Sequence, residues 1–280
     1  MPVRPFVALF GVAMSLLLVA PAAAAPAPQP AGAVTAPPDG PAQAWLLADL
    51  DTGQILGGRE PYSAHAPAST IKALLAMVVL DQLAPNAAVR ATAAHTQVEC
   101  SCVGLVPGQV YTARQLLDGL LMVSGNDAAN LLADMLGGSA VAVQKMNAKA
   151  YQLTARSTRA GSPSGLDGPG WESVTTPHDL AVIYREALRY PLFAQIVHQT
   201  SAQFPARSGY KEIRNQDRLL RNYPGFIGGK SGYTDLAQET YVGMAQRNGR
   251  RLVVVQMYGS DDLWDQAGRL LDWGFSQYGQ

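Results

Sequence analysis

Two β-rich runs joined by Asn248-Gly249 constrain the fold of this chain more than any other feature. They cover 240–246 and 251–258, and an Asn-Gly pair between such runs is the strongest short signal for a β-hairpin. A second pair of runs lies between residues 44 and 56, on either side of the turn sequence Asp51-Thr52-Gly53. Strands are therefore expected at both ends of the folded part of the chain.

The sequence between these strands has the apolar spacing of helices. Expected helices cover 69–83, 113–124, 127–136, 140–153 and 177–189, and a last one, 263–278, closes the chain. Terminal strands that pair around a helical middle predict an α/β (α+β) fold, in which an antiparallel sheet of N- and C-terminal strands packs with helices. Alternating βαβ units are not expected.

Composition excludes several classes of function. The chain has 280 residues, of which 48% are hydrophobic, enough to bury one sizeable core or two modest ones. Lys plus Arg number 21 and balance 21 Asp plus Glu, so there is no global basic field for nucleic acid. The four histidines are scattered and no pair has metal-ligand spacing, so neither a metal nor another cofactor is expected.

The N-terminal stretch is typical of a secretory signal. Arg4 precedes an apolar run over 6–20, and small residues follow with a cleavage site after Ala24. The run is shorter than the ~20 residues that span a bilayer, so membrane attachment would require an uncleaved segment. We predict a signal peptide over 1–24, a stiff Pro/Ala-rich linker over 25–40 and one folded domain over 41–280.

The two cysteines, Cys100 and Cys102, are separated by one residue. Export would place them in an oxidising compartment, where they could form a disulfide. An i, i+2 bridge requires a sharp backbone turn, because an extended pair lies near the limit of disulfide reach. The sequence leaves two alternatives open, a disulfide or two small side chains packed in a loop.

Ser69-Thr70-Ile71-Lys72 has the form S-x-x-K, which matters only if both side chains lie on one helix face. The following segment has no Gly or Pro before Pro85 and is apolar almost all round, as in a buried helix. A second match, Ser208 to Lys211, contains a glycine directly after the serine and is interpreted as a loop. A buried Lys72 tends to lose its proton and could then deprotonate Ser69. The alternative is a lysine that covers apolar surface and extends its amine to solvent.

Two further motifs occur once each. Ser124-Gly125-Asn126 is the one S-x-N sequence, and it joins two expected helices, where it could present polar groups to a cleft or simply cap a helix. Lys230-Ser231-Gly232 is the one K-[S/T]-G sequence. Glycines on both sides would let the backbone of a ligand approach a strand edge. A phosphate loop is excluded because the first glycine of the G-x-x-x-x-G-K pattern is missing before Gly229 and Lys230.

Together, the three motifs resemble those of the serine penicillin-recognising enzymes. Within that superfamily the chain is similar to low-molecular-weight D-alanyl-D-alanine carboxypeptidases from about residue 44 to residue 275. Pro107-Gly108-Gln109, Ser162 to Leu166 and Gly229 to Thr234 extend the likeness. The resemblance implies the β-lactamase/transpeptidase-like fold, with an all-helical subdomain beside the sheet.

The resemblance also implies a role for each motif residue. Ser69 would be the acylated nucleophile, Lys72 its base and Ser124 a proton relay. The substrate-binding residues would be Asn126, Lys230, Ser231, Gly232 and Tyr233, and the backbone N–H groups of Ser69 and Tyr233 would form the oxyanion hole. Two departures are Ser231 in place of threonine and the lack of an arginine over 260–266.

The implied activity is removal of the terminal D-alanine from peptidoglycan stem peptides outside the cytoplasmic membrane, in association with the cell wall, with β-lactam antibiotics as covalent inhibitors. The alternatives are a β-lactamase and a non-catalytic wall-binding protein. A class A β-lactamase would need a deacylating glutamate, and Glu172, Glu186 and Glu212 stand in no E-x-x-x-N frame. The extra β-domain and C-terminal anchor of many relatives are not expected here.

Overall fold

A computed structural model describes residues 36–278, so the predicted signal peptide and most of the predicted linker lie outside the described residues. The first strand begins at Ala42. The strands are β1 (Ala42–Asp49), β2 (Ile55–Arg59), β3 (Ala88–Arg90), β4 (Val110–Thr112), β5 (Ser201–Pro205), β6 (Tyr210–Arg214), β7 (Phe226–Thr234), β8 (Gln238–Arg247) and β9 (Arg250–Gly259). The helices are η1 (Ala68–Ile71), α1 (Lys72–Gln82), α2 (Ala93–Thr96), α3 (Ala113–Met122), α4 (Asn126–Met135), α5 (Ser139–Gln152), α6 (Pro177–Ala187), α7 (Pro191–His198), α8 (Leu219–Asn222) and α9 (Leu263–Ser276).

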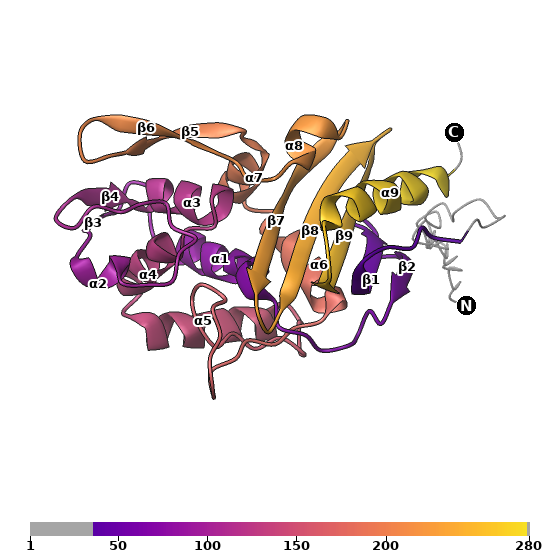
Figure 1. Cartoon of the computed structure of the whole chain (residues 1–280), viewed down its shortest axis with the longest axis horizontal. Helices are drawn as coiled ribbons and strands as arrows, with labels where there is room; N and C mark the ends of the chain where they lie inside the picture. Colours follow the sequence, from indigo (N-terminus) through magenta and orange to yellow (C-terminus); the bar gives the residue numbers. More distant parts are fainter. Residues whose placement is uncertain (1–35, 279–280) are drawn as a thin grey trace, which may run out of the picture.

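The terminal strands form one antiparallel sheet in the order β2-β1-β9-β8-β7, which confirms the predicted α/β architecture (Figure 1). The turn between β8 and β9 contains Asn248 and Gly249, both with positive φ angles, 51° and 78°. Asn and Gly adopt this conformation more readily than other residues, and two such residues give a turn whose twist matches the strands. The hairpin signal of the sequence was therefore correct.

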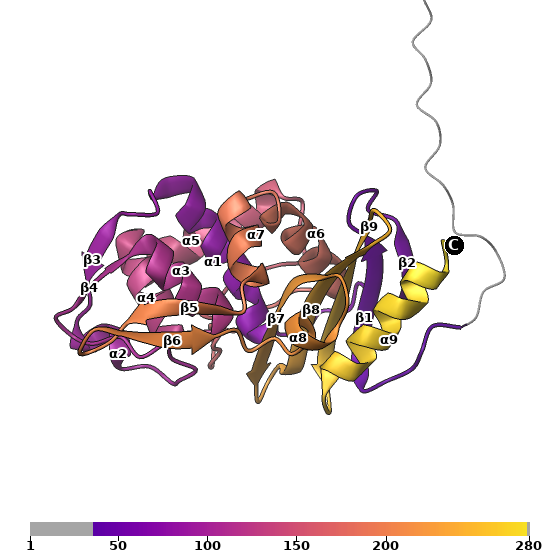
Figure 2. The ribbon, with the colours of Figure 1, turned by 90° about the horizontal axis from the view of Figure 1, so that it is seen from above.

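Both faces of the sheet are buried. In β1, Leu46 and Ala48 face one hydrophobic cluster, whereas Trp45 and Leu47 face another. Side chains alternate between the faces of a strand, so an apolar run without polar interruptions is what a strand covered on both sides requires. Helix α9 covers one face, and α6 lies on the other with the rest of the helical region (Figure 2).

Helices α1 to α5 and α7 lie to one side of the sheet, next to β7, where an all-helical subdomain was expected (Figure 1). This part is not all-helical, because it also contains the two-stranded sheets β3-β4 and β5-β6. Helix α1 is buried along most of its length and packs against α3, α4, α5 and α6. Strand β7 is the edge strand of the sheet on this side. The boundary between sheet and helices therefore runs between β7 and the segment that starts at Ala68.

Several details differ from the sequence predictions. The helix expected over 69–83 begins as a 3₁₀ turn and becomes α-helical at Lys72. Lys211 of the second S-x-x-K match lies in a strand instead of a loop, within the β5–β6 hairpin, which the sequence analysis missed together with α7. Within the described residues, no helix is both long and apolar enough to cross a bilayer.

Candidate active site

Ser69 and Lys72 meet because η1 runs directly into α1. Side chains three residues apart eclipse one another in a 3₁₀ turn, so the hydroxyl and the amine point the same way. Lys72 Nζ lies 2.6 Å from Ser69 Oγ. The geometry that the S-x-x-K motif requires is thus present, although the helix type differs from the expected one.

The Lys72 side chain is fully buried. Its Nζ donates to Asn126 Oδ1 at 2.7 Å and lies 3.4 Å from Ser124 Oγ. Burial lowers the pKa of this amine well below its usual range, and the nearby charge of Lys230 lowers it further. A neutral amine at this position can accept the proton of the Ser69 hydroxyl. The alternative of a lysine that reaches solvent is wrong.

Ser124 has a left-handed backbone, with φ of 60°. This conformation is uncommon for a residue with a side chain and persists where the surrounding structure holds it in place. Helix α3 ends at Met122, and the Gly125 N–H donates to the Gly119 carbonyl at 2.9 Å, which turns the chain sharply. The turn directs Ser124 Oγ to the two buried lysines.

Lys230 enters the same group of side chains from β7. Its amine is almost fully buried and donates to Ser124 Oγ at 2.9 Å and to the Ser231 carbonyl at 2.6 Å. Burial lowers the pKa of Lys230 to about 7, against the opposing effect of the Asp217 carboxylate. One serine hydroxyl is therefore shared by two amines whose pKa values are both depressed.

Gly232 brings β7 close to the start of η1. A Cβ atom at Gly232 would lie 2.6 Å from the backbone nitrogen of Ser69, so no larger residue fits without displacement. Thr240 on β8 fixes the same junction, because its hydroxyl lies 3.0 Å from both the Pro67 and the Gly232 carbonyl oxygens. The backbone of β7 thus borders the space above Ser69.

The segment that contains Gly165 packs against Ala68, the residue before Ser69. Ala68, next to Ser69, has a φ of 47°, and a Cβ atom at Gly165 would lie 2.0 Å from the Ala68 carbonyl oxygen. Gly165 itself has a φ of 86°. The glycine is needed both for its own conformation and for this contact. The sequence pattern identified the segment without giving this reason.

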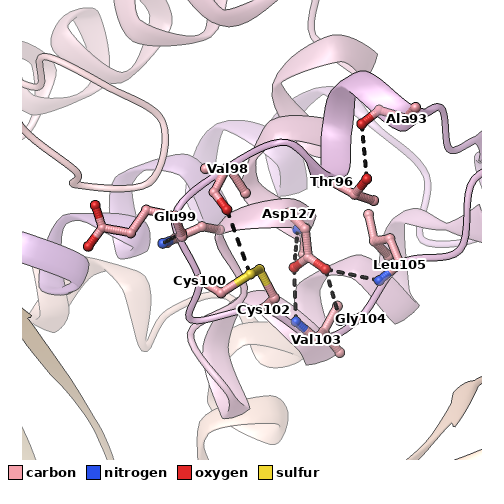
Figure 3. The surroundings of a disulfide bond; sticks show 12 residues. Ala93, Thr96, Val98, Glu99, Cys100, Cys102, Val103, Gly104, Leu105 and Asp127 are labelled. Carbon is pink, nitrogen blue, oxygen red and sulfur yellow. Dashed lines mark hydrogen bonds between the residues drawn. A yellow bond between two sulfur atoms is a disulfide. The ribbon is translucent and has the colours of Figure 1, made fainter.

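Asn126 begins α4 and is held by the segment that contains the two cysteines. Its Nδ2 donates to the Glu99 carbonyl at 2.6 Å, and its backbone N–H donates to the Ser101 carbonyl at 2.7 Å. Cys100 and Cys102 form a disulfide, which decides between the two alternatives that the sequence left open (Figure 3). The Cα atoms lie only 4.7 Å apart, as the sharp turn requires.

Asp127 anchors the next part of this segment. Its buried carboxylate accepts hydrogen bonds from the backbone N–H groups of Val103, Gly104 and Leu105 at 2.8 to 2.9 Å (Figure 3). In the sequence, Asp127 is indistinguishable from an ordinary residue of a helix N-terminus. The spacing to the partner segment, more than twenty residues, gave no signal for this contact.

These side chains surround a cleft of about 280 Å³. The lining residues are Ser69, Glu99, Cys100, Ser101, Ser124, Asn126, Leu166, Gln216, Ser231, Gly232, Tyr233, Thr234, Glu239 and Trp264. Lys72 and Lys230 are not among these lining residues, but their amines contact the hydroxyls of Ser69 and Ser124, respectively. No arginine is among the lining residues in the described part of the chain, and Arg218, which stacks on Trp264, is paired with Asp262.

Asp217 is a buried carboxylate near the cleft that the sequence analysis missed. It accepts from the Tyr241 hydroxyl at 2.9 Å and from the Leu219 N–H at 3.0 Å. A Cβ atom at Gly229 would lie 2.4 Å from its Oδ2, so the carboxylate packs directly against the residue before Lys230. Burial raises the pKa of Asp217 to about 6. Residues 36–278 contain no group of three or more His, Cys, Asp or Glu side chains arranged to hold a metal ion.

Comparisons with known proteins find similarity in both sequence and fold. The family model described as D-alanyl-D-alanine carboxypeptidase matches residues 31–261. The chain is 60% identical over 253 residues to the D-alanyl-D-alanine carboxypeptidase DacB2 of Mycobacterium tuberculosis, which covers 89% of this chain and 87% of that protein. It is 28% identical to DacF of Bacillus subtilis, where the match covers 85% of this chain and 63% of the relative.

Solved structures agree. A D-alanyl-D-alanine carboxypeptidase from Mycobacterium tuberculosis matches with a TM-score of 0.86 at 59% identity, over 90% of this chain and 97% of that one. A Streptomyces DD-transpeptidase matches with a TM-score of 0.80 at 28% identity, over 86% of this chain and 99% of that one. The fold and the site therefore define a serine-type hydrolase of the penicillin-binding class. Within that class, the chain belongs to the D-alanyl-D-alanine carboxypeptidase family.

Proposed function

We propose that this protein is an exported serine D,D-carboxypeptidase that removes the terminal D-alanine from peptidoglycan stem peptides through an acyl-enzyme on Ser69. One observation carries the proposal: the amine of Lys72, fully buried and with a depressed pKa, lies 2.6 Å from Ser69 Oγ at the wall of a cleft. A hydroxyl next to a neutral amine is an activated nucleophile.

In the first step, Ser69 Oγ attacks the carbonyl carbon of the D-Ala-D-Ala peptide bond while its proton passes to Lys72. The backbone N–H groups of Ser69 and Tyr233 stabilise the oxyanion, a contribution that is typically a few kcal/mol. Ser124, in contact with both lysine amines, carries a proton to the leaving amine of D-alanine. Water then hydrolyses the ester and regenerates Ser69.

The remaining motif residues bind the peptide. Strand β7 pairs with β8 on one side, and no strand of the described chain pairs with its other edge, so an extended peptide can lie along it. Lys230 supplies positive charge beside Ser231, Gly232 and Tyr233, where we place the substrate carboxylate. Asn126 directs its carbonyl to Lys72 and lines the cleft, where it can contact the substrate amide.

The test is release of free D-alanine from an N-acyl-D-Ala-D-Ala peptide by the mature protein. We expect release by the wild type, loss in Ser69→Ala, and a penicillin adduct that maps to the peptide containing Ser69. The matched control is Ser208→Ala, which changes the serine of the second S-x-x-K sequence and should leave release unchanged. Absence of D-alanine release from every such peptide would refute the proposal.

A β-lactamase is less well supported. Glu172, Glu186 and Glu212, the glutamates between the S-x-N and K-S-G motifs, are absent from the residues that line the cleft. A long-lived adduct with a fluorescent penicillin fits the carboxypeptidase, and rapid turnover fits the β-lactamase. Export of the chain is tested separately by N-terminal sequencing of the secreted protein, for which we expect residue Ala25 first.

A further inference from the structure

The disulfide between Cys100 and Cys102 forms part of the wall of the active-site cleft. Cys100 and Ser101 line the cleft together with Ser69 and Asn126. Cys100 is exposed and Cys102 is partly exposed, so a small thiol can reach the bond from solvent. The chain contains two cysteines in all, and both are in this bond. A reductant therefore has a single target in the protein.

The disulfide closes a short ring over residues 100–102, and the two carbonyl groups that hold Asn126 lie in this ring or next to it. The Glu99 carbonyl, on one side of the loop, accepts from Asn126 Nδ2, and the Ser101 carbonyl, inside it, accepts from the Asn126 N–H. In the described part of the chain, these are the hydrogen bonds that connect residues 98–102 to the rest of the protein, and both end on Asn126. The disulfide therefore adds a covalent constraint on the backbone that carries both acceptors.

Asn126 transmits this constraint to the catalytic base. Because its amide nitrogen is bound to the Glu99 carbonyl, its Oδ1 is turned toward Lys72, 2.7 Å from Nζ. If the Glu99 carbonyl moves, the amide can rotate, and Lys72 loses an acceptor that fixes its amine beside Ser69. Asp127 holds residues 103–105 independently, so the rest of the segment keeps its place (Figure 3).

On this basis we propose that the Cys100–Cys102 disulfide is a positioning element for Asn126, and that its reduction by a thiol lowers the turnover of the enzyme without unfolding it. This inference rests on the function proposed above. A thiolate attacks Cys100 Sγ and the S–S bond breaks with Cys102 as the leaving thiolate, which takes a proton. A second thiol then attacks the mixed disulfide, so that two protein thiols and one disulfide of the reagent result. The Val98 carbonyl oxygen, 3.7 Å from Cys100 Sγ, is an acceptor for the thiol formed there.

The experiment compares the wild type and Asn126→Ala, each oxidised and after reduction with dithiothreitol under native conditions. Intact mass confirms the gain of two hydrogens, and thermal unfolding confirms that the reduced protein is folded. We expect reduction to lower kcat/KM for D-alanine release by the wild type about tenfold, with most of the loss in kcat, as for the loss of about one hydrogen bond in the transition state. Reduction should leave the residual rate of Asn126→Ala unchanged, because the disulfide acts through the missing side chain.

Cys100→Ser/Cys102→Ser without reductant should reproduce the reduced wild type and should not respond to dithiothreitol. Equal losses in the wild type and in Asn126→Ala would overturn the inference, because the disulfide would then act on the structure in general. An active enzyme that reduction does not change would overturn it too, while leaving the proposed function intact. An oxidised protein that neither releases D-alanine nor reacts with penicillin would overturn both.

Discussion

Lys72 and Lys230, which come from a helix and from an edge strand, both contact Ser124 Oγ, at 3.4 and 2.9 Å. Two amines this close cannot both carry a proton without mutual repulsion, and burial of each adds to the cost. The arrangement in which Lys72 is neutral and Lys230 is charged suits both proposed roles, base and carboxylate ligand. Ser124 Oγ lies between the two amines, within hydrogen-bond distance of both.

The pH dependence of kcat/KM should therefore be bell-shaped. Because the two lysines interact, the apparent pKa values of its two limbs describe the pair together. Activity rises with pH as Lys72 loses its proton and falls as Lys230, with a pKa lowered to about 7, loses its charge. Lys230→Arg keeps a positive charge at every accessible pH. We expect this variant to lose the alkaline limb in a profile measured from pH 5 to 10, whatever its maximal rate.

An unchanged alkaline limb in Lys230→Arg would mean that another group titrates there. The matched control is Lys145→Arg, at a lysine that contacts Gln82 and the Leu136 carbonyl far from the cleft and should keep the wild-type profile.

Lys72→Met should slow acylation strongly and stabilise the fold. Loss of the base should lower the rate of penicillin acylation by about 100- to 10,000-fold. Replacement of a buried amine by an apolar side chain of similar volume should raise the free energy of unfolding at pH 7 by about 1 to 4 kcal/mol.

The increase in the free energy of unfolding caused by Lys72→Met should become smaller as pH rises. The pKa of Lys72 is lower in the folded protein than in the unfolded chain, so the unfolded chain binds more protons between the two values. Wild-type stability therefore rises with pH across that window, and the advantage of the variant shrinks. Urea denaturation at pH 7 and pH 9.5 measures it, and an equal or larger gain at pH 9.5 would contradict the argument.

Gly165→Ala should disrupt the site, whereas Gly170→Ala should not. The two glycines have nearly the same φ, 86° and 85°, but a Cβ at Gly165 meets the Ala68 carbonyl at 2.0 Å and one at Gly170 meets no atom within 4 Å. The left-handed backbone costs each alanine about 1 to 2 kcal/mol. Gly165→Ala should in addition displace the turn before Ser69 and lower acylation by penicillin at least about tenfold. Equal acylation rates in the two variants would show that the contact does not position Ser69.

Asp217→Asn should change both stability and the response of activity to pH. The folded pKa of Asp217 is raised to about 6, above that of the unfolded chain. Its contribution to stability is therefore full below the unfolded value and is lost as pH rises through 6, by up to about 3 kcal/mol. The variant lacks this decline and should be more stable than the wild type at pH 7.

The Asp217 carboxylate also raises the pKa of Lys230. Its removal should shift the alkaline limb of kcat/KM to lower pH, which the same titration detects. A limb that stays in place or moves upward would exclude this electrostatic coupling. Asp265→Asn, at an exposed position in the first turn of α9, serves as the control for the loss of one negative charge.

The sequence predicted the sheet and the main helices because their signals are local. Each of these signals lies within about ten residues of the sequence. They are the alternation of apolar and polar residues in strands, the Asn248-Gly249 turn, and the spacing of apolar residues in helices. The β5–β6 hairpin was missed because its strands are short and one face stays polar, so neither run stands out. The 3₁₀ turn at Ser69 was missed because the residues that shape it, Gly165 and Gly232, are remote in the sequence.

The site was predicted through its motifs, and the residues that support the motifs were not. Asp127 contacts backbone groups more than twenty residues away, and Asp217 contacts Tyr241 twenty-four residues away. Neither side chain differs in type from the many surface carboxylates. The cysteine pair remained undecided because no local sequence pattern shows the turn that brings the two Cα atoms to 4.7 Å from each other.

The open edge of β7 has a consequence beyond catalysis. A strand edge that admits a substrate peptide, as we propose for β7, cannot be blocked by a permanent neighbour, so its backbone groups are equally available to an extended segment of another molecule. The same edge of β7 would therefore govern both aggregation of the protein and binding of the peptide. A covalent inhibitor that fills the cleft should slow aggregation in concentrated solutions of the protein, even where it leaves the thermal midpoint of unfolding unchanged.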